Sequence, residues 1–151
     1  MTAGKFRTLL TSIFVIVVGS SAYADPIWEP QRGASDRKAI LDVVRDVIEG
    51  EIGVPVELVV ARLRTDGHWA FVQATPQNLG GAPIDWSKTK FAQDWKADMM
   101  SDVVMGLVKK SGSGWMLEDY VLGPTDVYWV SWVSKRKLPE KLFHDGKPFV
   151  D

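Results

Sequence analysis

The chain has 151 residues, with 18 Lys and Arg against 19 Asp and Glu, a formal net charge of −1 and no cysteine. The lack of cysteine excludes disulfides, cysteine-ligated metal sites and a thiol nucleophile. The slightly acidic balance argues against a nucleic-acid partner, which favours a basic excess. A chain of this length is expected to form one domain that is stabilised by its apolar core.

Residues 1–24 carry the pattern of a cleavable secretory signal. Lys5 and Arg7 precede the apolar run Leu9–Val18, and small residues in an A-x-A arrangement end at Ala24. A transmembrane anchor needs about 20 apolar residues, and this run is shorter. The pattern therefore predicts a signal peptide over residues 1–24 and a periplasmic or secreted protein. Because no cysteine can accept a lipid, the cleaved protein is expected to keep no stable membrane anchor.

The mature chain is predicted to begin with a flexible lead, residues 25–34, followed by a single domain over residues 35–151. That domain opens with a helix over Ser35–Glu49, with Ser35 as the expected N-cap and Gly50 as the expected terminator. Its apolar stripe at helical spacing consists of Ile40, Val43, Val44, Val47 and Ile48. The remaining surface is charged, so the helix is expected to lie with this stripe on a sheet.

Two segments rich in β-branched and aromatic residues, Val56–Thr65 and Trp69–Thr75, flank Asp66-Gly67, a strong signal for a hairpin turn. With these two residues as the turn, Thr65 is predicted to pair with His68, Arg64 with Trp69, and so on along the two strands. One face of this hairpin is small and aliphatic and is expected to receive the helix: Val59, Ala61, Leu63, Ala70, Val72 and Ala74. The opposite face combines guanidinium groups with aromatic rings: Arg62, Arg64, Trp69, Phe71 and Gln73.

A second hairpin is predicted from Val103–Lys110 and Trp115–Leu122, joined by a Ser-Gly-Ser-Gly loop. One compatible register pairs its residues as follows: Val108 with Leu117, and Gly106 with Asp119. Between the hairpins, Gln77–Ser101 is the least regular stretch, and long irregular segments are often functional. Within it, four-residue spacing predicts a short helical packing stripe of Phe91, Trp95 and Met99.

The segment after Pro124 has two competing predictions. A helix capped by Thr125 or Asp126 would extend to about Arg136. A strand over Asp126–Val133 competes with it, because this stretch is rich in β-branched and aromatic residues. The predicted fold class is α+β: an N-terminal helix packed on a curved antiparallel sheet of about four strands, with a short C-terminal helix.

Few side chains suggest catalysis. His68 follows the hairpin turn and His144 lies in the polar tail, so both are expected to be exposed, and neither a metal site nor another cofactor is predicted. The weak catalytic candidates are Asp85, Asp119 and Asp126, since an Asp among apolar neighbours can have a raised pKa that suits a general base. The competing interpretation places Asp119 on a solvated face, Asp85 in an Asx turn and Asp126 at a helix cap.

The main binding candidate is the Arg-aromatic face, defined by Arg62, Arg64, Trp69 and Phe71, together with Trp86 in the irregular stretch. Guanidinium groups beside aromatic rings suit an anionic or aromatic ligand, or a protein partner. If Trp69 and Phe71 are exposed, they also favour a homodimer. The alternative is that the irregular stretch covers this face and supplies carboxylates to the arginines: Asp85, Asp94 or Asp98.

The order of helix, hairpin, long connection, hairpin and aromatic closing segment resembles the cystatin-like and NTF2-like α+β architecture. The runs Asp66–Ala74, Pro83–Trp86 and Gly123–Val127 are similar to a group of uncharacterised small secreted bacterial proteins. The sequence therefore favours a non-enzymatic domain that binds a protein or a small ligand. Two alternatives stay open: an NTF2-like lyase or isomerase with Asp85 or Asp119 as a buried general base, and an inhibitor of a secreted hydrolase.

Overall fold

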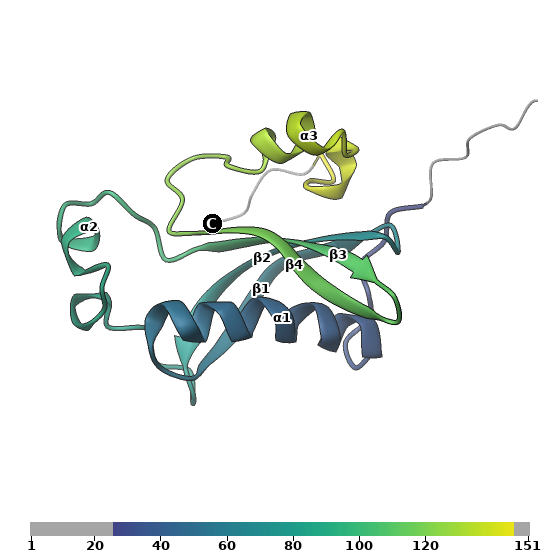
Figure 1. Cartoon of the computed structure of the whole chain (residues 1–151). Helices are drawn as coiled ribbons and strands as arrows, with labels where there is room; N and C mark the ends of the chain where they lie inside the picture. The colour runs from purple at the N-terminus through teal and green to yellow at the C-terminus, as the bar shows by residue number, and fades with distance from the viewer. Residues whose placement is uncertain (1–25, 147–151) are drawn as a thin grey trace, which may run out of the picture.

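A computed structural model describes residues 26–146, so the predicted signal peptide lies outside the described residues. Helix α1 (Ser35–Ile52) lies on one face of a four-stranded antiparallel sheet, and the C-terminal segment with α3 (Val130–Arg136) lies on the other (Figure 1). The predicted α+β class is confirmed, with an N-terminal helix, a curved sheet and a short C-terminal helix.

The four strands form a meander in which sequence order and spatial order agree. Their bounds are β1 Val56–Thr65, β2 Trp69–Asn78, β3 Val104–Ser111 and β4 Gly114–Leu122. Three short helical pieces lie outside the sheet: η1 Trp86–Lys88 and α2 Ala92–Lys96 between the hairpins, and η2 Glu140–Leu142 after α3. Figure 1 shows α2 beyond one end of the sheet, away from both packed faces.

Helix α1 buries three of the five residues in the predicted stripe, and Val43 and Val47 are half-buried. Ile40, Val44 and Ile48 are fully buried, and they pack in one cluster with the apolar side chains of the sheet. The interface is tight: an added Cβ on Gly106 of β3 would come within 2.9 Å of the Val44 side chain. A glycine at this position therefore allows the helix to approach the sheet closely.

Both ends of α1 differ from the prediction. Ser35 is the first helical residue, and no side chain caps the N-terminus, so the expected Ser35 cap is wrong. The helix continues through Gly50 and ends at Gly53, where φ is 86° and the backbone N–H donates to the Glu49 carbonyl at 2.8 Å. Gly53 adopts the left-handed conformation that a C-terminal cap requires, and Gly50 does not.

The first hairpin turns one residue later than predicted. The Asp66 N–H donates to the Trp69 carbonyl, and Asp66 Oδ1 accepts the amides of His68 and Trp69 at 2.9 and 2.7 Å. Thr65 therefore lies opposite Ala70 and not opposite His68. Because the pairing shifts by two residues, the side chains next to the turn keep their predicted faces.

Farther from the turn, the predicted aliphatic face is wrong, because a β-bulge lies between Val60 and Arg62. The extra residue, Ala61, is exposed, and beyond it the alternation is reversed. Val60 and Leu58 pack on the α1 side, whereas the Val59 side chain that was expected there is 51% exposed. The turn signal in the sequence gives no information about a bulge inside the strand.

In the second hairpin, Val108 pairs with Leu117 as predicted. A bulge between Leu107 and Val108 then shifts the register, so that Gly106 lies opposite Tyr120 and not opposite Asp119. After the sheet, the helical prediction is confirmed and the competing strand is wrong, although α3 begins only at Val130. The bend and turn before α3 leave Trp129 as its N-cap residue.

The second face of the sheet is covered by residues 129–145, which we call the C-terminal layer. Phe143 stacks on Trp129 with ring centroids 5.4 Å apart at an angle of 7°, and it lies 5.1 Å from Phe71 of β2. Trp132 donates its Nε1 hydrogen to Asp119 Oδ2 of β4 at 3.0 Å. The sheet is thus packed on both faces, by α1 and by the C-terminal layer.

Two carboxylates connect α1 to the second hairpin and to the irregular stretch through side-chain hydrogen bonds. Asp36 Oδ1 accepts from Trp115 Nε1 at 3.1 Å, and Glu51 accepts from Lys90 Nζ at 2.6 Å and from Tyr120 Oη at 2.9 Å. The Trp115 bond lowers the pKa of Asp36, and the Lys90 bond, followed by the Tyr120 bond, lowers the pKa of Glu51. Both carboxylates therefore favour folding in their ionised form.

We expect the free energy of unfolding to fall as the pH is lowered from about 7 to about 3. Both carboxyls have a lower pKa in the folded than in the unfolded chain. Their contribution is complete above the ordinary carboxyl pKa and is lost as the pH falls through the lowered folded-state values. In urea denaturation, the double variant Asp36→Asn, Glu51→Gln should flatten this dependence, whereas Asp46→Asn, at an exposed position of α1, should not. The same pH dependence in the double variant and the wild type would contradict the assignment.

Candidate functional site

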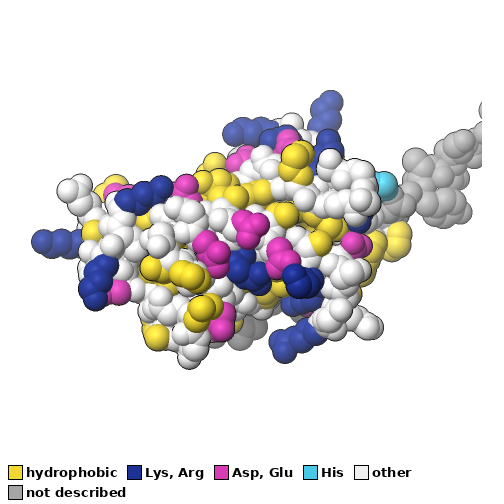
Figure 2. All heavy atoms as spheres, turned by 60° about the horizontal axis from the view of Figure 1, so that its bottom comes forward, with side chains coloured by type: hydrophobic (Ala, Val, Ile, Leu, Met, Phe, Trp, Pro, Cys, Tyr) yellow, Lys and Arg dark blue, Asp and Glu magenta, His cyan; other side chains and the backbone are white. Residues whose placement is uncertain are grey.

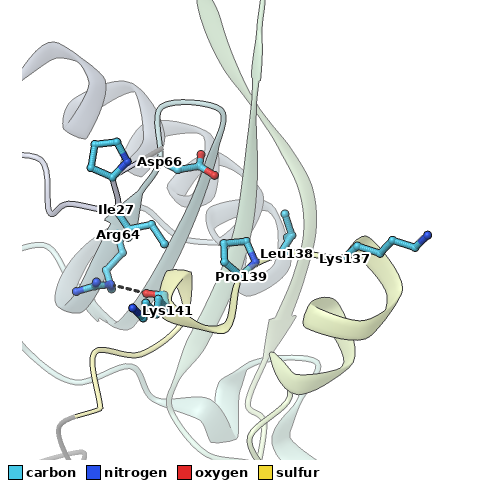
Figure 3. A pocket seen from close by; sticks show the side chains of 8 residues that line it. Ile27, Arg64, Asp66, Lys137, Leu138, Pro139 and Lys141 are labelled. Atoms are coloured by element: carbon cyan, nitrogen blue, oxygen red, sulfur yellow. Dashed lines mark hydrogen bonds between the residues drawn. The ribbon is translucent and has the colours of Figure 1, made fainter. Parts of the chain in front are cut away.

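A groove of about 720 Å³ lies beside the turn between β1 and β2, where the C-terminal layer meets the start of the described chain. We call it the basic groove (Figure 3). Its walls combine apolar and charged side chains: Pro26, Ile27, Arg64, Asp66, Lys137, Leu138, Pro139 and Lys141. The groove is therefore built by three segments that are far apart in sequence.

Packing on the sheet fixes the walls of the basic groove. Trp28 and Thr65 exchange two backbone hydrogen bonds of 2.9 Å, which hold the neighbouring Ile27 against the end of β1. On the other side, Leu138 is buried in the apolar cluster of the C-terminal layer. The part of the lead that the structure describes is thus paired with the sheet.

Arg64 and Lys141 form the charged centre of the basic groove. Arg64 donates from Nε to the Lys141 carbonyl at 2.9 Å, and Figure 3 shows the two residues side by side. Within residues 26–146, neither the terminal guanidinium nitrogens of Arg64 nor Nζ of Lys141 has a hydrogen-bond or ion-pair partner. The side chain of Lys137 points away from them in Figure 3. Two unpaired cationic groups thus face one cavity.

The groove carries an excess of positive charge although the chain as a whole is slightly acidic. Asp66 is its one acidic lining residue, and Asp66 Oδ1 already accepts two backbone amides of the turn. The side of the molecule that carries α1 differs, because acidic and basic side chains alternate across it (Figure 2). The basic excess is a local property of the groove and makes it suited to an anion.

Of the predicted Arg-aromatic face, Arg64 lines the basic groove. Phe71 is fully buried under the C-terminal layer, so it is not available to a ligand or a second copy. Arg62 donates to the Phe143 carbonyl at 3.0 Å and lies 3.8 Å from the Asp145 carboxylate. Trp69 is half-buried, with Lys109 Nζ 5.1 Å from its ring centre. The C-terminal layer, and not the irregular stretch, covers this face.

Trp86, the other predicted binding residue, is buried at the base of the irregular stretch. Its ring centre lies 6.2 Å from that of Phe91 and 5.9 Å from that of Trp95. The expected packing stripe is confirmed only for Phe91, since Trp95 is exposed and Met99 more so. Helix α2 ends at Lys96, so Met99 lies outside it.

The three weak catalytic candidates lie in different environments. Asp85 is 52% exposed, and the hydrogen bond from Ser87, followed by the ion pair with Lys88 at 2.9 Å, lowers its pKa. Asp119 faces the C-terminal layer instead of a solvated face, and its oxygens accept from Trp132 Nε1 and the Tyr120 amide. Both carboxylates therefore already accept hydrogen bonds from neighbouring residues.

Asp126 is exposed, and its Oδ1 accepts the Val127 amide at 2.6 Å. The expected role as helix cap is wrong, because α3 begins four residues later. Within the described residues, no hydrogen bond joins Asp126 to either of the other two candidates. Three isolated carboxylates do not form the acid-base pair that a lyase or isomerase needs.

Of the two histidines that were expected to be exposed, His68 is exposed and His144 is not. His68 lies in the first hairpin turn and is exposed, whereas His144 is half-buried and lies 3.0 Å from Glu140. Residues 26–146 contain no group of three or more His, Asp or Glu side chains that could hold a metal ion. The same part of the chain has no helix of the length and apolarity that crossing a bilayer requires.

Lys141 and the apolar walls of the basic groove were not predicted from the sequence. A signal was present, because residues 135–141 contain four basic side chains around Pro139. Such a run usually indicates a solvated surface. Its role becomes visible only when the C-terminal layer is placed on β1.

Comparisons with protein-family models, with curated proteins and with solved structures found no match to this chain.

Proposed function

We propose that the protein is a periplasmic or secreted, non-enzymatic binding domain that holds a small anionic ligand with an apolar part in the basic groove. The observation that carries the proposal is that two cationic groups lie together at the centre of a groove with apolar walls. Within residues 26–146, the terminal guanidinium nitrogens of Arg64 and Nζ of Lys141 have no hydrogen-bond or ion-pair partner. The secretory pattern of residues 1–24 supports the location.

The geometry of Arg64 suits a carboxylate or phosphate head group. The bond from Nε to the Lys141 carbonyl orients the guanidinium group and leaves its two terminal nitrogens as parallel donors. Because this orientation exists before binding, less side-chain entropy is lost when the anion arrives. The Lys141 ammonium adds a second charge next to the first.

The walls of the groove suit an aliphatic or aromatic tail. Ile27 and Leu138 lie with two prolines beside the cationic centre. An apolar group that covers them gains about 25 cal/mol for each Å² removed from water. An amphiphilic anion therefore matches the groove better than an inorganic ion, which would leave the apolar walls hydrated.

Binding explains the structure better than the two alternatives do. A lyase or isomerase would use Asp85 or Asp119. Asp85 is exposed, and the hydrogen bond from Ser87, followed by that from Lys88, lowers its pKa. Asp119 already accepts hydrogen bonds from Trp132 Nε1 and the Tyr120 amide. Inhibition of a hydrolase needs a projecting segment that enters an active site. The charged centre found here is instead recessed in a groove.

The test is calorimetric titration of the mature protein with decanoate, decyl phosphate and neutral octyl glucoside. We expect the two anions to bind and the neutral amphiphile not to bind. Arg64→Gln should weaken anion binding by about tenfold or more, because a charge-assisted hydrogen bond contributes about 1.5–3 kcal/mol. Higher salt should weaken the binding of wild-type protein.

The matched control is Lys135→Ala, since Lys135 is an exposed cation on α3 outside the groove. It should leave the affinity within about twofold of wild type, as expected for a remote surface charge. Equal affinity for octyl glucoside, or equal losses in Arg64→Gln and Lys135→Ala, would contradict the proposal.

A further inference from the structure

A second groove, of about 270 Å³, lies near the opposite end of β2 from the basic groove. The last residues of β2, the irregular stretch and α2 form it, at the end of the sheet where Figure 1 shows α2. We call it the tryptophan groove. The two grooves share no lining residue, so a ligand in the tryptophan groove is independent of the proposed function.

The aromatic wall of this groove consists of one buried and one exposed indole ring. Trp86 is only 3% exposed, and it supports Trp95, whose ring plane is tilted by 31° against it. Trp95 lies on the five-residue helix α2, and 41% of its surface is exposed. A large aromatic surface held in place and left in water is typical of recognition sites.

The polar side chains of the tryptophan groove offer hydrogen-bond acceptors. Asp102 is its one charged lining residue, and within residues 26–146 its carboxylate has no ion pair or hydrogen bond. Gln77 donates from Nε2 to Glu57 at 3.1 Å, which leaves Oε1 as an acceptor for the groove. Lys, Arg and His are missing from the lining residues. The charge of the groove is therefore complementary to a cation.

We infer that the tryptophan groove binds a small organic cation of the alkylammonium class, with the cationic head over the Trp95 ring and its charge balanced by Asp102. An indole ring attracts a cation that lies over its face, and quaternary ammonium groups are the ligands that exploit this best because they carry little water. The Asp102 carboxylate attracts a cation electrostatically and does not attract a neutral ligand in this way. A volume of about 270 Å³ admits a trimethylammonium group with a short substituent.

The test is calorimetric titration of the mature protein with tetramethylammonium chloride in the millimolar range, beside neopentyl alcohol, which has a similar shape and no charge. We expect saturable binding of the cation at one site and none of the alcohol. Asp102→Asn and Trp95→Ala should each weaken binding by about tenfold, and Trp95→Phe should retain part of it. Asp94→Asn, which changes an exposed carboxylate of α2 outside the groove, should bind like wild type.

Both substituted side chains are exposed, so the variants are expected to fold, and a circular dichroism spectrum checks this. Three results would overturn the inference. The first is equal binding of neopentyl alcohol and the cation, and the second is an equal loss in Asp94→Asn and Asp102→Asn. The third is the absence of saturable cation binding to wild-type protein. Binding of glucose that depends on Asp102, with no binding of the cation, would assign the groove to a sugar instead.

Discussion

Replacing Phe143 with alanine should lower the free energy of unfolding by about 3–5 kcal/mol. Phe143 is fully buried, stacks on Trp129, and contacts both Phe71 of the sheet and Trp132 of α3. Removal of the ring leaves a cavity between the sheet and the C-terminal layer, which the flat ring of Trp129 cannot fill without losing its own contacts. Urea denaturation followed by tryptophan fluorescence measures the loss.

The loss is expected to be large because side chains carry the attachment of this layer. Among the described residues, no backbone hydrogen bond joins residues 129–146 to a strand. The layer is held by apolar packing and by a few side-chain bonds, such as Arg62 to the Phe143 carbonyl and Trp132 to Asp119. The control is Val130→Ala, which removes an exposed side chain of α3 and should cost less than about 0.5 kcal/mol. If Phe143→Ala were as mild as this control, the layer would not be packed on the sheet.

Gly106→Ala should lower the free energy of unfolding by about 1–3 kcal/mol. The added Cβ would lie 2.9 Å from Val44 Cγ2, and a β-branched side chain in a helix has almost no alternative rotamer with which to move away. The helix must therefore shift away from β3, and the buried contacts on both sides weaken. Chemical denaturation of the variant measures this cost.

Two further variants separate the steric cost from the general effect of replacing a glycine. Gly114→Ala adds a Cβ whose nearest neighbour is 3.9 Å away, so it should change stability by less than about 0.5 kcal/mol. Val44→Ala should reduce the effect of Gly106→Ala when the two are combined, with a coupling energy of about 1 kcal/mol. Additive effects in the double variant would show that the two residues are not in contact.

Local patterns in the sequence were sufficient to predict α1 and the approximate position of each hairpin. The stripe containing Ile40, Val44 and Ile48 is a periodic signal, and it is buried as predicted. Periodicity does not locate the end of a helix, and here a left-handed conformation at Gly53, not the presence of Gly50, determines it. Both bulges were missed, because a bulge depends on how two strands pair and not on the composition of either.

The candidate site could be predicted only in part, because it depends on contacts between distant segments. The sequence placed Arg64 on the correct face of the first hairpin. It could not show that Phe71 is covered by Phe143, which is 72 positions later in the chain. The same long-range packing brings Lys141 next to Arg64 and so creates the basic groove. Side-chain type indicated the chemistry, and tertiary packing decided which residues are accessible.

An NMR titration of the ¹⁵N-labelled protein with decanoate would locate the bound anion. If the basic groove is the binding site, the amides of residues 64–66 and of Lys137, Leu138, Glu140 and Lys141 shift first, and all of them saturate with one dissociation constant. Arg64→Gln then removes these shifts while the rest of the spectrum stays that of folded protein. Shifts that do not saturate, or that follow exposed lysines such as Lys38 and Lys96 far from the groove, would contradict anion binding at Arg64 and Lys141.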